Sequence, residues 1–287
     1  MGLEGKRMRP LLVLMAHQLF NSNVEKSLPS AIAIELFHNF TLLHDDIMDN
    51  APIRRGHPTV HKKWNDNVAI LSGDVMMIKA YQLLSMLDAD ILKDVLDVFN
   101  KAAVEVCEGQ QQDMDFENQE TIYLIDYMRM IECKTAVLLA ASLKIGAIIA
   151  GANEKEQAHL YEFGINLGMA FQLKDDLLDV FGSPKVFGKQ LGGDILANKK
   201  TFLYLKALQL ADDSITARLK WYYRNNDKSK TKVNEVKAIF KNLNIKKHTV
   251  SIMKSYHVKA MKHLDSIDSD NKESLILFSN KLMERIS

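Results

Sequence analysis

Residues 32–50 read IAIELFHNFTLLHDDIMDN, an apolar stretch that ends in three aspartates with DDxxD spacing. Five apolar residues recur along it at intervals of three or four: Ile32, Leu36, Phe40, Leu43 and Ile47. This spacing predicts one apolar stripe along an α-helix. The aspartate pattern recurs downstream, in FQLKDDLLD at residues 171–179. The chain therefore embeds clustered carboxylates in apolar helical segments twice.

Helical periodicity extends over much of the chain, and it predicts the fold class. The same spacing covers residues 68–87, 122–150, 160–180 and 201–210. The 5 prolines and 13 glycines lie mostly between such segments. We find no alternating strand pattern of any length and no linker rich in Pro, Gly or Ser. The sequence predicts an all-α fold in a single domain over residues 1–287.

The overall composition limits the function classes. Hydrophobic residues make up 47% of the 287 residues and charged residues 25%, which suits a globular core. A net charge of +1 argues against nucleic-acid binding through global electrostatics, so anion binding must depend on local clusters. Cys107 and Cys133 fit no metal-ligand spacing. The most apolar segment, residues 136–152, contains Lys144 and is too short for a membrane span. No secretory signal follows Met1, and we expect a cytoplasmic protein without an integral membrane segment.

The aspartates share helix faces with other polar residues. In the first helix one face carries His38, Thr41, Asp45 and Asp49, and in the second it carries Gln172, Asp175 or Asp176, and Asp179. Carboxylates beside apolar neighbours are costly unless cations compensate them. Oxygen ligands without nearby Cys or His ligands favour Mg²⁺ or Mn²⁺. Because Mg²⁺ completes its shell with water and phosphate oxygens, two such clusters suggest several ions shared with a diphosphate.

A single DDxxD pattern is most often a solvated helix face, so its repetition decides the interpretation. Both copies lie on apolar helices, and each precedes a basic loop with Gly and Pro, at residues 50–61 and 182–200. The basic residues that we single out are Lys6, Arg7, Arg9, Arg54, Arg55, Lys134, Lys189, Lys199 and Lys200. Arginine suits bidentate phosphate recognition, and lysine supplies a point charge. Together these features favour metal–diphosphate binding.

Several motifs, in this order, resemble those of the trans-type isoprenyl diphosphate synthases. They are GKRMRP at 5–10, LLHDDIMDNAPIRRGHPTVH at 42–61, EGQQQDMD at 108–115, KT at 134–135, FQLKDDLLDVFG at 171–182 and GKQLGGD at 188–194. The resemblance implies an isoprenoid-synthase helical bundle with a deep central cavity, two aspartate helices facing each other across its mouth, and a homodimer. It also leads us to expect that one or two helices usual before GKRMRP are missing here.

The resemblance also implies roles for individual residues. About three Mg²⁺ ions, with Mn²⁺ as a possible substitute, would be held mainly by Asp45, Asp49 and Asp175. Direct or indirect partners of these ions would be Asp46, Asp176 and Asp179. The allylic diphosphate would contact Arg54, Lys134, Gln172 and Lys189, with Lys199 nearby. The diphosphate of isopentenyl diphosphate would bind Lys6, Arg9, His38 and Arg55. Thr135 and Gln172 would lie near the developing carbocation.

The implied reaction is ionisation, condensation and elimination. Cations neutralise the departing diphosphate, and the allylic carbon–oxygen bond breaks. The double bond of isopentenyl diphosphate attacks the carbocation, and proton loss to the released diphosphate gives a chain longer by one isoprene unit. No nucleophilic Ser or Cys is required.

Product length is partly readable from the first aspartate helix. Phe40 precedes Asp45 by about 7.5 Å along the helix axis and Phe37 by about 12 Å, so either ring could form the floor of a product cavity. The alternative is an ordinary core aromatic, which the position of Phe37 suits better than that of Phe40. An aromatic residue at Phe40, followed by Thr41 with no insertion in DDIMD, resembles short-chain synthases of the geranylgeranyl type. This resemblance leads us to expect farnesyl or geranylgeranyl products, of about fifteen to twenty carbons.

Two other functions are compatible with parts of the sequence. A class I terpene cyclase shares the fold, but its second metal motif is normally a mixed Asn/Ser/Glu pattern, unlike the DDLLD of residues 175–179. A cyclase also has no use for a second diphosphate site. A non-catalytic subunit of a heteromeric synthase is disfavoured by the complete sets of aspartates and arginines.

Overall fold

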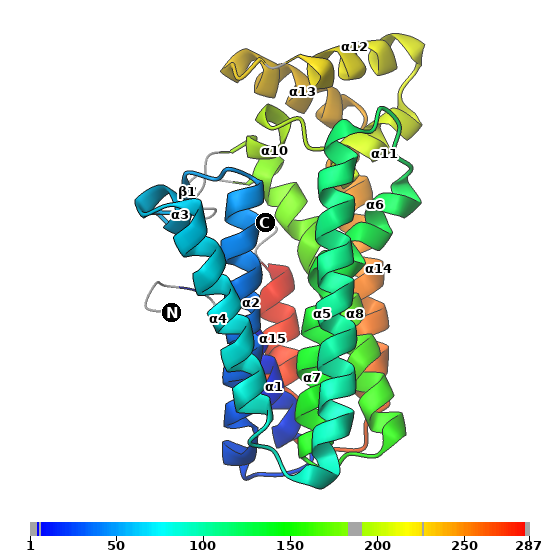
Figure 1. Cartoon of the computed structure of the whole chain (residues 1–287). Coiled ribbons are helices and arrows are strands. Elements are labelled where there is room, and N and C mark those ends of the chain that lie inside the picture. Colours follow the sequence, from blue (N-terminus) through cyan, green and yellow to red (C-terminus); the bar gives the residue numbers. More distant parts are fainter. Residues whose placement is uncertain (1–4, 6, 183–190, 226, 285–287) are drawn as a thin grey trace. The chain divides into compact units, whose positions relative to one another are not determined.

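The computed structural model describes residues 5, 7–182, 191–225 and 227–284 (Figure 1). In this part of the chain, nearly all regular structure is helical, and the strands are limited to β1 (Ile53–Arg54) and β2 (His57–Pro58). The predicted all-α class is confirmed. No helix among the described residues is both long and apolar enough to cross a membrane.

The chain divides into two compact units. The first comprises Met1–Ala103, Leu138–Glu162 and Leu264–Leu275, and the second comprises Val104–Val137, Phe163–His263 and Ile276–Ser287. Several long helices contribute residues to both units: α5 (Ala89–Asn118), α8 (Glu154–Phe181), α14 (Ile245–Asp265) and α15 (Glu273–Glu284). The single domain expected from the sequence stays a prediction.

The first unit is organised around α2 (Leu28–Met48), which packs along α4 (Asp66–Leu84) (Figure 1). Its other elements are α1 (Met8–Gln18), the 3₁₀ helix η1 (Val24–Ser27), α3 (Val60–Lys63) and most of α7 (Val137–Ile149). Ile34 and Phe37 of α2 are fully buried, whereas Ile32 of the predicted stripe is 45% exposed. The rest of that stripe is half-buried. The most buried face of α2 is therefore offset from the stripe that the spacing indicated.

The end of α2 and the hairpin behind it fix the backbone around the first aspartates. Asn50 takes a left-handed conformation, with a φ of 48°, which ends the helix. In the hairpin, Arg55 and Gly56 have φ of 52° and 76°, the signs that a tight two-residue turn between antiparallel strands requires. The Thr59 hydroxyl donates to the carbonyl of Ala51 at 2.7 Å. This bond fastens the hairpin against the end of the helix.

The second unit has a separate apolar core built by α6 (Leu124–Ile131), the second half of α8, α11 (Phe202–Leu210) and α13 (Lys230–Asn242). Phe202 and Phe240 are fully buried in it, and the rings of Tyr204 and Tyr223 stack with centroids 4.0 Å apart. The remaining elements are α10 (Gly193–Leu196) and α12 (Asp213–Arg224).

The long helix predicted over residues 122–150 is interrupted. A π-helical turn (Glu132–Ala136) separates α6 from α7. Such a turn adds one residue to the helical repeat, and apolar periodicity alone does not show it. The interruption falls on Lys134 and Thr135, the residues singled out in the sequence.

Candidate active site

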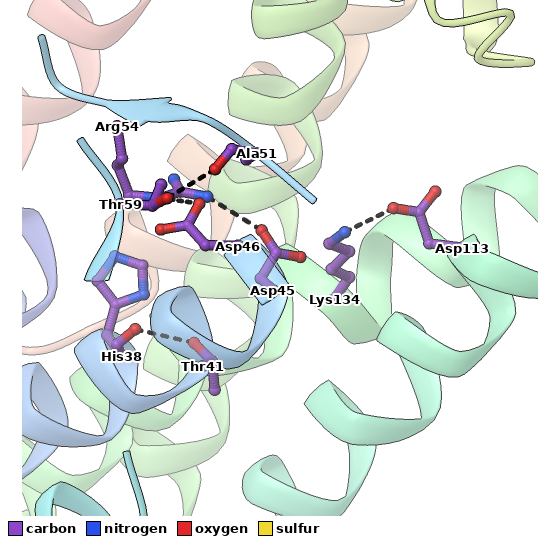
Figure 2. A network of polar contacts seen from close by, with 9 residues as sticks. All are labelled: His38, Thr41, Asp45, Asp46, Ala51, Arg54, Thr59, Asp113 and Lys134. Atoms are coloured by element: carbon purple, nitrogen blue, oxygen red, sulfur yellow. Dashed lines mark hydrogen bonds and ion pairs between the residues drawn. The ribbon is translucent and has the colours of Figure 1, made fainter. Parts of the chain in front are cut away.

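The first aspartate cluster lies on the last turns of α2 and is tied to the hairpin by Arg54. The Arg54 guanidinium donates from Nε to Asp46 Oδ1 at 2.7 Å and from Nη2 to Asp45 Oδ2 at 3.2 Å (Figure 2). Asp49 is exposed at the helix end, and its backbone N–H donates to the carbonyl of Asp45. The structure thus brings Arg54 onto two of the three aspartates of the first cluster.

Asp46 is the buried member of this cluster. Burial raises the pKa of the Asp46 carboxyl, and the charge and hydrogen bond of Arg54 oppose that rise. His61 of α3 also acts electrostatically on Asp46. The His61 ring is 7% exposed, and neither ring nitrogen has a hydrogen-bond partner in the described part of the chain. His61 closes the quoted motif at 42–61, but no sequence signal assigned it a role.

His38 of α2 is in contact with Arg9 of α1. Arg9 Nη1 donates to His38 Nε2 over 3.1 Å. Burial first, and then the charges of Arg9, Arg55, Arg54 and Arg7, lower the pKa of His38 to about 2. The imidazole is therefore neutral at physiological pH and accepts a hydrogen bond from Arg9.

Arg9 and Arg55 lie within electrostatic range of each other, as expected for two residues that share one anion. Burial lowers the pKa of Arg9 to about 10, Glu35 opposes that shift, and Arg55 adds to it. The Arg55 guanidinium lies against the backbone of Gly5, where an added Cβ would come within 2.6 Å of Nη1. Of the four residues expected to bind isopentenyl diphosphate, Lys6 lies outside the described residues.

The second aspartate cluster, on α8, is held by a chain of hydrogen bonds. Thr135 Oγ1 donates to Gln172 Oε1 at 3.0 Å, and Gln172 Nε2 donates to Asp176 Oδ1 at 3.1 Å. The Tyr127 hydroxyl donates to the other oxygen of Asp176. Burial, and then the charge of Asp194, raises the pKa of Asp176 to about 7. Tyr127 was not identified from the sequence, because it reads as a core aromatic of an amphipathic helix.

The three aspartates of this cluster differ in what they hold. Asp179 is buried, and its Oδ2 accepts the N–H of Asp194 at 3.1 Å, at the start of α10. Asp176 is committed to Tyr127 and Gln172. Asp175 is half-buried and is the most open of the three. The principal metal-binding role that the resemblance implies for Asp175 stays a prediction.

Lys134 and Thr135 lie in the π-helical turn. Two glycines allow the neighbouring helices α5 and α8 to pack closely against this turn. A Cβ on Gly109 of α5 would lie 2.4 Å from the backbone nitrogen of Lys134. A Cβ on Gly168 of α8 would lie 2.5 Å from Cα of Ala136. The Lys134 ammonium donates to Asp113 Oδ2 at 2.5 Å (Figure 2). Gly109 and Asp113 both belong to the quoted EGQQQDMD motif, which had received no role.

A cavity of about 140 Å³ in the second unit gathers most of these groups. Its lining includes Asp113, Lys134, Thr135, Gln172, Asp176 and Lys199. Lys200 also lines it and donates to the carbonyls of Phe116 (2.7 Å) and Gln119 (2.6 Å), which satisfies the C-terminal end of α5. Lys189 lies outside the described residues. The expected facing of the two aspartate helices involves both units and stays a prediction.

The donor set fits Mg²⁺ on chemical grounds. The ligand atoms on offer are hard carboxylate oxygens, which suit Mg²⁺ or Mn²⁺. Among the described residues, no group of three or more His, Cys, Asp or Glu side chains is arranged to hold a metal ion by itself. Mg²⁺ is commonly held by one or two carboxylates and completes its shell with water and substrate phosphates. Such an ion would therefore be shared with a phosphorylated ligand.

Comparison with known proteins gives the family. The family model described as polyprenyl synthetase matches residues 1–242. The chain belongs to the polyprenyl synthetase family. It is 42% identical over 238 residues to a short chain isoprenyl diphosphate synthase of Methanocaldococcus jannaschii, covering 83% of this chain and 72% of that one.

Solved structures of the polyprenyl synthetase family share the fold. A crystal structure of a geranylgeranyl pyrophosphate synthase superposes with a TM-score of 0.94 at 45% identity, covering 100% of this chain and 89% of the other. A geranylgeranyl pyrophosphate synthase of Corynebacterium glutamicum, complexed with isoprenyl diphosphate and magnesium, gives 0.90 at 27% identity over 98% and 87% of the two chains. The family and the enzyme class predicted from the sequence, a trans-prenyltransferase with short-chain products, are confirmed.

Proposed function

We propose that this polyprenyl synthetase condenses isopentenyl diphosphate with an allylic diphosphate (dimethylallyl, geranyl or farnesyl) and releases farnesyl or geranylgeranyl diphosphate together with inorganic diphosphate. One observation carries the assignment of the site. The cavity of the second unit is lined by Lys134, Thr135, Gln172 and Lys199, all of which the resemblance places near the allylic substrate.

The aspartates are proposed to hold Mg²⁺. Asp45, Asp49 and Asp175 would be the main ligands, and Asp46, Asp176 and Asp179 would assist them directly or through hydrogen bonds. About three ions are expected, and Mn²⁺ would substitute for Mg²⁺. When bound, the metal supplies positive charge that favours departure of the diphosphate. The fit of the carboxylates and the magnesium bound by the Corynebacterium relative support this proposal.

The allylic diphosphate is proposed to contact Arg54, Lys134, Gln172 and Lys189, with Lys199 nearby. Arg54 would offer its planar guanidinium, and the lysines would offer point charges. The oxygens of Thr135 and Gln172 would stabilise the developing carbocation by their dipoles. The hydrogen bonds that Gln172 forms with Thr135 and Asp176 fix its amide, so this dipole is oriented before the substrate arrives.

The diphosphate of isopentenyl diphosphate is proposed to bind Lys6, Arg9, His38 and Arg55. The neutral His38 fixes Arg9 through the 3.1 Å contact, so that Arg9 keeps its positive charge for an anion. Arg55 lies nearby, as its electrostatic effect on Arg9 shows. Two guanidinium groups near one another suit a ligand with two charged phosphates.

Product length is proposed to depend on Phe37, Phe40 and Thr41. Phe37 is 1% exposed and packs edge-on against Phe99, with ring centroids 5.2 Å apart. Phe40 is half-buried, and its ring centroid lies 5.6 Å from that of Phe37. The Thr41 hydroxyl donates to the carbonyl of His38 at 2.9 Å, which leaves its small side chain satisfied on the helix. Phe40 thus lies next to the Phe37–Phe99 aromatic pair.

The chain is proposed to form a homodimer through the outer face of α4. Val68, Leu71, Val75 and Ile78 recur at intervals of three and four, and all are exposed, Leu71 by 65%. A continuous apolar face of this kind marks a protein interface more often than a solvated surface. The expected cytoplasmic location stays a prediction.

A two-substrate assay tests the proposed reaction. Purified protein is incubated with Mg²⁺, isopentenyl diphosphate and geranyl diphosphate, and released diphosphate is measured. We expect release when both substrates and the metal are present, and none after chelation. A cyclic hydrocarbon formed from the allylic substrate alone would point to a cyclase. Absence of turnover by the protein alone would point to a subunit that needs a partner.

A further inference from the structure

Glu35 is a buried carboxylate of α2 with no role in the function proposed above. Glu35 is 6% exposed, and it precedes His38 and Asn39 by about one helical turn. A buried charge is costly unless it is paired and hydrogen-bonded. Glu35 forms an ion pair with Arg7, and its Oε1 accepts from Asn39 Nδ2 at 3.1 Å. Both of these contacts are made by Oε1.

Glu35 also acts on the arginines proposed to bind isopentenyl diphosphate. Its charge opposes the lowering of the Arg9 pKa by burial and by Arg55. It likewise opposes the lowering of the Arg55 pKa by burial, Arg7 and Arg54. Of these arginines, Arg54 is bonded to Asp45 and Asp46. Glu35 is therefore the carboxylate that offsets repulsion among Arg7, Arg9 and Arg55.

The ion pair fixes the path of the chain that carries Arg9. Alternate residues of this segment contact the same region: Gly5 lies against Arg55, Arg7 pairs with Glu35, and Arg9 reaches His38. Arg7 has a φ of 45°, in the left-handed region that a non-glycine residue rarely occupies. Such a conformation persists when surrounding contacts hold it, and the Arg7–Glu35 pair is one such contact.

Two effects of Glu35 on diphosphate affinity oppose each other. Its negative charge repels a bound anion, but that charge is already neutralised by the adjacent Arg7. The Arg7–Glu35 pair also orders the segment before the diphosphate binds. This ordering reduces the rotamer entropy that the arginine side chains lose when the diphosphate binds. Because the pair is nearly neutral and the ordering acts on the whole segment, anchoring outweighs repulsion.

We propose that Glu35 is a positioning residue for the diphosphate of isopentenyl diphosphate, acting through Arg7 on the segment that carries Arg9. This inference rests on the proposed function, since it refines the binding of one of its two substrates. It predicts that loss of Glu35 weakens binding of isopentenyl diphosphate and leaves binding of the allylic diphosphate unchanged.

The test compares Glu35→Gln, Arg7→Met and the double variant with Glu25→Gln, a control of equal charge change at an exposed position. We expect KM for isopentenyl diphosphate to rise about tenfold in each single variant, as for loss of a charged hydrogen bond. In the double variant, KM for isopentenyl diphosphate should be no higher than in the more affected single variant, because both substitutions remove the same contact. KM for the allylic substrate and kcat should change by less than about twofold.

Several outcomes would overturn the inference. An unchanged or lowered KM for isopentenyl diphosphate in Glu35→Gln would show that repulsion dominates. An equal rise in KM for both substrates would show a merely structural role. If the wild-type protein does not condense the substrates, the proposed function fails. Calorimetric titration with inorganic diphosphate then decides separately, because Glu35→Gln should bind it about tenfold more weakly, and equal binding would refute the anchoring role.

Discussion

At the scale of single residues, the surroundings of His38 determine its charge. The sequence placed His38 on the aspartate face, but periodicity cannot show that arginines from the N-terminal motif and from the hairpin converge on it. Burial and four neighbouring guanidiniums lower the pKa of its imidazole to about 2. An imidazole that would otherwise titrate near neutrality is therefore held neutral in the folded state.

This shift predicts a pH dependence of stability. The unfolded imidazole takes up a proton below about pH 6.5, whereas the folded one remains neutral down to about pH 2, so acid favours the unfolded state. His38 therefore contributes a loss of stability that begins near pH 6.5 and grows as the pH falls. The variant His38→Gln should flatten the decline of melting temperature between pH 6.5 and 4. An unchanged slope would contradict the assignment of a depressed pKa.

Alanine substitutions at Phe40 and Phe37 both test whether these rings limit product length, but they differ in their expected effect on stability. Phe37 is fully buried between other rings, so its truncation to alanine costs about 3–5 kcal/mol of stability. Phe40 is half-buried, so Phe40→Ala should lengthen the product while the fold is retained. Chromatography of the products with each allylic starter measures the length. A product distribution identical to that of the wild type would refute the role of Phe40.

At the scale of elements, the sequence predicted some helices but missed others, and it did not show the interruptions. Apolar spacing is a property of long regular stretches, so α2, α4, α8 and α11 overlap the expected segments, whereas the 30-residue α5 was not among them. The π-helical turn depends on backbone approach at Gly109 and Gly168, which are distant in sequence from Lys134. For the same reason, the hydrogen bonds of Asp176 with Tyr127 and of Lys200 with the end of α5 were not foreseen.

Gly109 provides a test of the π-helical turn. A Cβ there would meet the backbone of Lys134, so Gly109→Ala should displace Lys134 and Thr135. We expect a fall in kcat of at least about tenfold, because misplaced charges stabilise the transition state less. Gly146→Ala is the matched control, since its Cβ would meet the carbonyl of Val13, within the first unit.

Both glycine variants should lose some stability, on the order of 1–3 kcal/mol from overpacking. Assays are therefore run at a temperature where both remain folded by circular dichroism. If Gly146→Ala and Gly109→Ala reduce kcat equally, the turn has no special part in catalysis.

At the scale of the whole molecule, the fold and family were predictable because the motifs occur together in order along the chain. No single motif would have been sufficient, since one DDxxD pattern also suits a solvated helix. The sequence did not reveal the two compact units or the exposed face of α4, because amphipathic spacing does not distinguish a face that packs inside the chain from one that packs on a partner.

Arginine substitutions on the exposed face of α4 test whether the dimer forms through this helix. The double variant Leu71→Arg, Val75→Arg should convert the expected dimer into a monomer, because arginines would be buried without partners in the interface. Light scattering after size-exclusion chromatography measures the mass. Leu277→Arg, at an exposed leucine of α15, is the control and should leave the dimer intact. A dimer that survives the double variant would place the interface elsewhere.

The central claim is that the chain elongates an allylic diphosphate, and mass analysis of the product tests it most directly. Protein, Mg²⁺, isopentenyl diphosphate and geranyl diphosphate are incubated, and the dephosphorylated products are separated and identified by mass spectrometry. The account predicts farnesol or geranylgeraniol, formed only when both diphosphates are supplied. Recovery of unextended geraniol alone, or of a cyclic hydrocarbon made without isopentenyl diphosphate, would contradict it.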